Sequence, residues 1–161
     1  MKNINKIIVG VDFSSYSKDT LAYAATLAEK FQAELIIVNV INKRDIDTIL
    51  KVAEGQFDRK IEKYVKKTAE EYTKRVEEDR SRQLEKLIDE IGCSDLNLQK
   101  VFRVGVPFEE LINAIKDEGA DLMVMGQKGR SDLTDVLFGS NAERVFRRCP
   151  IPLLSVRSEK N

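Results

Sequence analysis

Histidine is absent from this sequence of 161 residues, and cysteine occurs only twice. Because no imidazole is available, every Ser-His-Asp or Cys-His mechanism is excluded, and so is every zinc site that needs a histidine ligand. Cys93 and Cys149 are too few for a disulfide scaffold, and their spacing matches no metal-binding motif. We therefore expect both thiols to be reduced, as is usual in the cytoplasm.

An excess of charge of one sign and a long apolar segment near the start are also lacking. Lysine and arginine together number 27, as do aspartate and glutamate, so the formal net charge is zero. Without a global positive field, we expect no binding of nucleic acid or of an anionic membrane. The first apolar run, residues 7–11, is far shorter than a signal-peptide core or a membrane span of about 20 residues. These features predict a cytoplasmic protein.

Short apolar runs alternate with segments of helical periodicity along a chain that has the length of one domain. The predicted strands cover residues 7–11, 35–41, 96–104 (near a sheet edge), 121–125 and 152–156. Besides a charged segment described below, the predicted helices run to Phe31 from a start capped by Ser14, Ser15 or Ser17, from Pro107 to Gly119, and from Asn141 to Arg148. Because a hairpin cannot join parallel strands, this order predicts an α/β domain with a parallel sheet.

Residues 43–91 are strongly charged, with 13 basic and 13 acidic side chains, and we predict a helical insertion with a solvated outer face. An apolar stripe at a spacing of three to four residues is interrupted at 79–83 and consists of Phe57, Ile61, Val65, Thr68, Tyr72, Val76, Leu84, Leu87 and Ile91. A helix over 57–91 would be about 52 Å long, against about 40 Å for the domain. It must overhang, or break near Arg80. It is either a crossover helix with a charged face, or a flap or dimer arm.

The segment 126–141 leads from the fourth predicted strand to the last helix, at the edge where parallel sheets bind ligands. Gly126 and Gly129 allow a tight turn that brings main-chain N–H groups against an anion. Gly139 and Ser140 present the N-terminus of the following helix, which attracts phosphate. These residue types predict a main-chain cradle for phosphate.

Lys128 and Arg130 in the same segment could supply whole positive charges to that phosphate. The alternative is purely structural, because Ser140 and Glu143 have the spacing of a capping box and glycines are ordinary turn residues. Neither a Walker A sequence nor a Gly-x-Gly-x-x-Gly fingerprint is present, so a phosphate site here would belong to neither kind.

The pattern of Gly126, two residues, Gly129, nine residues and Gly139-Ser140 resembles the nucleotide-binding signature of the universal stress protein family, which holds ATP. Nearly the whole chain shares the resemblance, including Val11-Asp12-Phe13-Ser14, Gly105-Val106-Pro107 and Cys149-Pro150-Ile151-Pro152. It implies a single Rossmann-like domain over 1–161, similar to adenine nucleotide alpha hydrolases, with the charged insertion at about 43–91. It also implies an open five-stranded parallel sheet of order 3-2-1-4-5 with helices on both faces, a crevice between the first and fourth strands, and a homodimer formed through the last strand.

The resemblance assigns roles at that crevice: Asp12 would contact adenine or ribose, Val40 would line the adenine pocket, and the glycine positions with Asn141 would hold ribose and phosphates. The candidate binding residues are Asp12, Phe13, Ser14, Val40, Met125, Gly126, Lys128, Gly129, Arg130, Gly139, Ser140 and Asn141. The physical reasons are that a carboxylate accepts hydrogen bonds, an apolar wall suits a ring face, and amides suit phosphate. Asp12 could instead cap a helix, and Val40 could be plain core.

The implied function is an ATP-binding switch or sensor in the stress response, with ATP bound with or without Mg²⁺ and with an unidentified protein partner. Slow ATP hydrolysis at the same site and a nucleotide-free dimeric interaction module are the alternatives. AMP or another adenine ligand could also replace ATP. Asp132 and Asp135 could hold Mg²⁺ or a water, or be solvated loop carboxylates. No catalytic residue and no protein metal ligand is assigned.

Overall fold

The computed structural model describes residues 3–51, 59–128 and 139–157, which contain five strands and five helices. The strands are β1 (Lys6–Gly10), β2 (Glu34–Asn42), β3 (Leu98–Gly105), β4 (Leu122–Gly126) and β5 (Leu153–Val156). The helices are α1 (Ser17–Phe31), α2 (Lys43–Lys51), α3 (Arg59–Ile91), α4 (Pro107–Glu118) and α5 (Ser140–Arg148).

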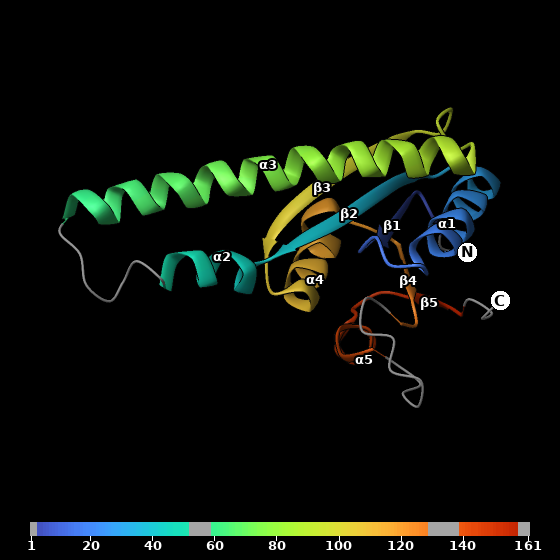
Figure 1. Cartoon of the computed structure of the whole chain (residues 1–161). Helices are drawn as coiled ribbons and strands as arrows, with labels where there is room; N and C mark the ends of the chain where they lie inside the picture. Colours follow the sequence, from blue (N-terminus) through green and yellow to red (C-terminus); the bar gives the residue numbers. More distant parts are fainter. Residues whose placement is uncertain (1–2, 52–58, 129–138, 158–161) are drawn as a thin grey trace.

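The strands form one parallel sheet in the order β3-β2-β1-β4-β5 (Figure 1). The expected order and the parallel pairing are confirmed, and so is the edge position of β3. The chain adds β2 and β3 on one side of β1 and then returns to add β4 and β5 on the other. In open α/β sheets, such a reversal of strand order leaves a crevice outside the carboxyl ends of the two central strands.

Alternate residues of the central strands face opposite helical layers, as the two-residue period of a strand requires. Ile7 and Val9 of β1 are fully buried in a cluster with residues of α1 and α3. Ile8, between them, is fully buried in a second cluster with residues of α4 and α5. Helices therefore cover both faces, and burial on both sides explains why β1 is a continuous apolar run rather than an alternating pattern.

The helix α3 has 33 residues, runs unbroken through Arg80, and overhangs the sheet together with α2 (Figure 1). The predicted overhang is confirmed, whereas a break near Arg80 is wrong. The sequence pattern did not separate α2, which begins directly after β2 and packs on α3 through a small cluster of Ile41, Ile46 and Ala69. Although α3 is long, no helix in the described residues has both the length and the apolarity to span a membrane.

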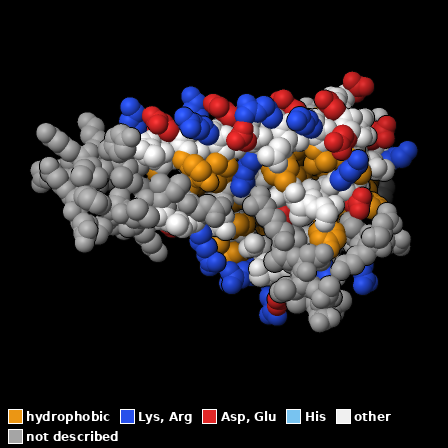
Figure 2. Space-filling view, in the orientation of Figure 1, with side chains coloured by type: hydrophobic (Ala, Val, Ile, Leu, Met, Phe, Trp, Pro, Cys, Tyr) orange, Lys and Arg blue, Asp and Glu red, His pale blue; other side chains and the backbone are white. Residues whose placement is uncertain are grey.

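The outer side of α3 carries charged side chains of both signs over the part whose side chains the structure describes, and hydrophobic side chains lie beneath it (Figure 2). This arrangement confirms the solvated outer face predicted for the charged insertion. The inner side includes Leu84, which is fully buried, and Ile88, which is 6% exposed, both in the cluster shared with α1 and the sheet. The C-terminal part of α3 is thus an ordinary crossover helix, and only its N-terminal part overhangs.

Helix ends follow the predictions only in part. Gly119 ends α4 with a left-handed backbone (φ 64°), and Pro107 begins that helix, as predicted. At the start of α1, however, the N-cap position is Tyr16, and no side chain caps the helix. The predicted serine cap is wrong because the Ser17 hydroxyl donates a hydrogen bond to the Asp12 carboxylate instead.

The buried contact of α3 with the sheet can be tested with Leu84→Ala. Leu84 has no exposed surface, so its truncation should lower the free energy of unfolding by about 3 kcal/mol, through lost transfer energy and a residual cavity. Urea unfolding measures this loss. The control is Lys86→Ala on the exposed side of the same helix, which should change the free energy by less than about 0.5 kcal/mol. Equal effects of the two variants would contradict the described packing.

Candidate functional site

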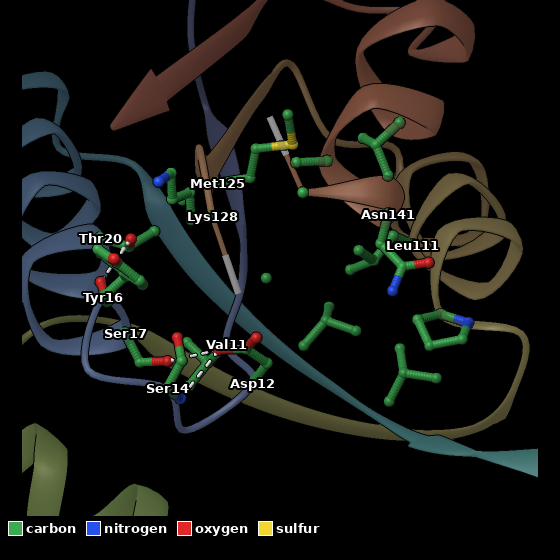
Figure 3. A pocket seen from close by; sticks show the side chains of 18 of the residues that line it. Val11, Asp12, Ser14, Tyr16, Ser17, Thr20, Leu111, Met125, Lys128 and Asn141 are labelled. Carbon is green, nitrogen blue, oxygen red and sulfur yellow. Dashed lines mark hydrogen bonds between the residues drawn. The ribbon is translucent and has the colours of Figure 1, made fainter. Parts of the chain in front are cut away.

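A cavity of about 320 Å³ lies at the carboxyl ends of the central strands (Figure 3). The ends of β1, β2 and β4, the starts of α1, α4 and α5, and one residue of α3 form its walls. Its lining consists of Gly10, Val11, Asp12, Ser14, Tyr16, Ser17, Thr20, Val38, Val40, Asn42, Arg80, Pro107, Leu111, Met125, Gly126, Lys128, Gly139, Ser140, Asn141, Ala142 and Val145. The cavity therefore occupies the crevice that the reversal of strand order predicts.

The turn after β1 is held by the carboxylate of Asp12. Its Oδ1 atom accepts hydrogen bonds from the Ser14 main-chain N–H and from the Ser17 hydroxyl, both at 3.0 Å (Figure 3). The Val11 N–H extends the pairing with β2 by donating to the Val38 carbonyl at 2.9 Å. Asp12 thus fixes the strand end and the start of α1 relative to each other while lining the cavity.

Phe13 has a left-handed backbone (φ 60°), which is uncommon for a residue other than glycine, asparagine or aspartate. Its partly buried side chain packs against the core cluster of α1 and α3 and does not line the cavity. The left-handed turn sends the phenyl ring to the core side, and the residues on either side of it, Asp12 and Ser14, stay in the cavity wall. Phe13 is therefore not brought into the predicted site.

Gly126, at the end of β4, lies where the chain passes very close to its neighbours. A Cβ atom there would be 3.1 Å from the Lys128 carbonyl oxygen and 3.1 Å from Thr20 Oγ1, tighter than ordinary van der Waals contact. With a larger residue, the Lys128 carbonyl or Thr20 would have to shift by a few tenths of an ångström. Glycine therefore fits the turn as it stands, which agrees with the close approach that the sequence predicts here.

The start of α5 forms the opposite side of the same wall. The Gly139 N–H donates to the Gln127 carbonyl at 3.0 Å, which brings the helix start next to the end of β4. Gly139 is the N-cap residue, no side chain caps the helix, and Ser140 and Asn141 follow as its first residues in the cavity lining. The capping box predicted for Ser140 is wrong, because Ser140 lies inside the helix. The first-turn N–H groups, which lack intrahelical partners, therefore stand at the cavity.

The remaining walls are mostly apolar on the side of α4 and partly polar on the side of β2. Leu111, Met125 and Val145 provide the apolar surface. On the β2 side, Val40 lies next to Arg80 of α3, whose guanidinium Nη1 donates to the Val40 carbonyl at 2.9 Å. The cavity thus combines an apolar wall, main-chain donors and charged side chains, which is the usual make-up of a small-molecule site.

Nine of the predicted site residues line the cavity: Asp12, Ser14, Val40, Met125, Gly126, Lys128, Gly139, Ser140 and Asn141. Gly129, Arg130, Asp132 and Asp135 lie outside the described residues. Arg80 also lines the cavity but was not predicted as a site residue. The one sequence feature that marks it is the polar interruption of the apolar stripe at 79–83. Sequence reasoning also missed Tyr16, Ser17 and Thr20, which the short turn after β1 could have indicated.

The described lining of the cavity contains one carboxylate and no cysteine. Cys93 and Cys149 do not line the cavity, and burial raises the pKa of both thiols, so they remain protonated at neutral pH and are poor nucleophiles. Asp12 is the one carboxylate among the described residues of the lining. Within 3–51, 59–128 and 139–157, no group of three His, Cys, Asp or Glu side chains is placed to hold a metal ion.

The role of Asp12 in holding the turn can be measured with two substitutions. Asp12→Ala removes the acceptor of both hydrogen bonds and should lower the free energy of unfolding by about 1–2 kcal/mol. Asp12→Asn keeps an acceptor oxygen and should lose less than about 0.5 kcal/mol. Chemical denaturation compares the two with the unchanged protein. If both variants lose the same stability, the negative charge of Asp12 rather than its hydrogen bonds to the turn stabilises the protein, which contradicts this role.

Known proteins resemble this chain in sequence over almost its whole length. The model of the family described as "Universal stress protein family" matches residues 3–157. Universal stress protein MJ0577 of Methanocaldococcus jannaschii is 27% identical over 161 residues, which cover 97% of this chain and 96% of that protein. Universal stress protein YxiE of Bacillus subtilis is 31% identical over 158 residues, which cover 95% of this chain and 99% of that protein.

Solved structures share the fold over almost the full length. The structure of MJ0577 has a TM-score of 0.76 at 24% identity and covers 99% of this chain and 100% of its own. A universal stress protein solved in complex with cAMP has a TM-score of 0.60 at 20% identity, covering 98% and 100%. One from Archaeoglobus fulgidus, solved in complex with dAMP, has a TM-score of 0.56 at 15% identity, covering 96% and 98%.

Proposed function

Because the chain belongs to the universal stress protein family, we propose that it binds an adenine nucleotide, ATP, in the cavity between β1, β4 and α5. The observation that carries this proposal is the meeting of a glycine turn and an uncapped helix start at one cavity. The uncapped helix start offers main-chain N–H groups and a positive partial charge, which suit a phosphate chain, and Gly126 keeps the neighbouring turn free of a side chain. Relatives of the same fold solved with cAMP and dAMP support an adenine ligand.

The proposed pose places each part of the nucleotide against matching chemistry. The adenine ring would lie along Val40 and the apolar wall, and the Asp12 carboxylate would accept a hydrogen bond from ribose. The phosphates would meet the first-turn N–H groups of α5 and the ammonium group of Lys128. Mg²⁺ would accompany ATP through its phosphate oxygens rather than through a cluster of described protein ligands.

We propose that the bound nucleotide acts as a switch or sensor in the stress response. ATP would bridge Lys128 and Gly139, which flank the segment 129–138, and a protein partner would read the resulting surface. Only differential contacts between two states shift such an equilibrium, so the phosphates must contact one state better than the other. Slow hydrolysis could reset the switch.

The glycine cradle is tested by Gly126→Val combined with Gly129→Val. A side chain at position 126 would press on Lys128 and Thr20, so the double variant should fold but lose ATP binding in calorimetry by at least about tenfold. Thr26→Val, on the exposed face of α1, should leave the affinity unchanged. Unchanged affinity of the double variant would end the assignment of the phosphate site.

We also propose a homodimer through β5, the edge strand next to β4. An edge strand presents unpaired main-chain groups that a second copy can use, and Leu154 of β5 is 37% exposed. Leu154→Asp should therefore give monomers by light scattering. Tyr23→Asp places the same charge on an exposed residue of α1 and should leave the dimer intact. An unchanged mass for Leu154→Asp would contradict the proposed seam.

A further inference from the structure

Arg80 lies where the buried stripe of α3 passes the ligand cavity. The stripe is apolar on both sides of it: Ala69 belongs to the cluster with α2, and Leu84 belongs to the cluster with α1 and the sheet. Arg80 is only 9% exposed, whereas Arg82, two residues along, has a side chain that is 67% exposed. Arginine is seldom buried without specific partners, so this position calls for a specific explanation.

The Arg80 guanidinium donates hydrogen bonds to two residues of β2. Its Nη1 atom donates to Asn39 Oδ1 at 2.7 Å and to the Val40 carbonyl at 2.9 Å. Asn39 is 1% exposed, and its Nδ2 atom donates to the Val11 carbonyl at 2.7 Å. A continuous set of hydrogen bonds therefore joins α3 to the ends of β2 and β1, and both Val40 and Val11 line the cavity.

The orientation of the Asn39 side-chain amide follows from which of its neighbours donate and which accept hydrogen bonds. A guanidinium has donors only, so Asn39 turns its oxygen toward Arg80 and its N–H toward Val11. If Arg80 moved away, the Asn39 oxygen would lose this partner inside the protein, which is unfavourable. The position of α3 and the geometry of the strand ends are thus set by the same contacts.

We propose that Arg80 is a positioning residue of the nucleotide site and links its occupancy to the position of the arm, defined as α2 together with residues 59–79 of α3. This inference rests on the proposed function. A nucleotide that contacts the ends of β1 and β2 favours the state in which Arg80 is docked on Asn39 and Val40. By reciprocity, docking of Arg80 raises the affinity for the nucleotide. The arm is then a second surface whose position depends on whether the nucleotide site is occupied, so a partner that contacts the arm can respond to the bound nucleotide.

The test compares ATP binding by calorimetry in the unchanged protein, Arg80→Met, Arg80→Lys and Arg82→Met. Methionine keeps an unbranched side chain but removes the donors and the charge, so Arg80→Met should weaken ATP binding at least tenfold. Lysine keeps the charge without the planar guanidinium and should weaken it at least threefold. Arg82→Met, on the exposed side of the same helix, should stay within twofold.

Amide hydrogen exchange separates positioning from a merely structural role. In the unchanged protein, ATP should slow exchange both at the start of α5 and in α3 around residues 76–84. In Arg80→Met, ATP at saturating concentration should slow exchange at α5 alone. If Arg80→Met lowers stability but keeps the affinity and the ATP-dependent protection of α3, the residue is only structural and the inference is overturned.

The outcomes also separate this inference from the proposed function. If the unchanged protein binds no ATP, both fail. If it binds ATP and protects α5 but not α3, or if Arg80→Met binds as tightly as the unchanged protein, this inference fails alone. Should Arg80→Met not fold, Arg80→Lys decides, and an affinity equal to that of the unchanged protein overturns the linkage.

Discussion

The parallel pairing of β1 with β4 places the end of one strand, the end of the other and the start of α5 around one cavity. That pairing aligns Ile7, Ile8 and Val9 with Leu122, Met123 and Val124. Five of these residues are completely buried and Leu122 is partly buried, so the hydrophobic core holds the pairing firmly. Because the strands run in the same direction, the turns that follow them emerge at the same edge of the sheet. The polar groups of the site therefore owe their positions to apolar packing beneath them.

What the site then offers is mainly the backbone. Gly126 brings the turn close to Thr20 and Lys128, and the hydrogen bond from Gly139 to Gln127 sets the start of α5 beside it. Main-chain donors do not titrate and cost little reorganisation when an anion arrives, so such a site recognises a ligand without needing a reactive side chain. The sequence has no histidine, and burial raises the pKa of both cysteine thiols, which lie outside the lining of the cavity.

Much of the fold could be predicted because β1 and β2 are buried on both faces and leave unmistakable apolar runs in the sequence. The strand order came from the family resemblance, since apolar runs do not determine which strands pair. Arg80 could not be identified, because a polar residue in an apolar stripe resembles an interruption until its partner Asn39, 41 residues away, is placed beside it. The caps predicted at Ser17 and Ser140 were wrong for local reasons. The Ser17 hydroxyl donates to the Asp12 carboxylate, and the N-cap residue of α5 is Gly139.

The most direct measurement compares the main-chain amide resonances of Ser140, Asn141 and Ala142 during titrations with ATP and with adenosine. If backbone donors hold the phosphates, ATP shifts these resonances strongly, adenosine hardly shifts them, and both ligands shift resonances near Val40. If the α5 resonances stay in place at saturating ATP, or respond equally to adenosine, the phosphate cradle is contradicted.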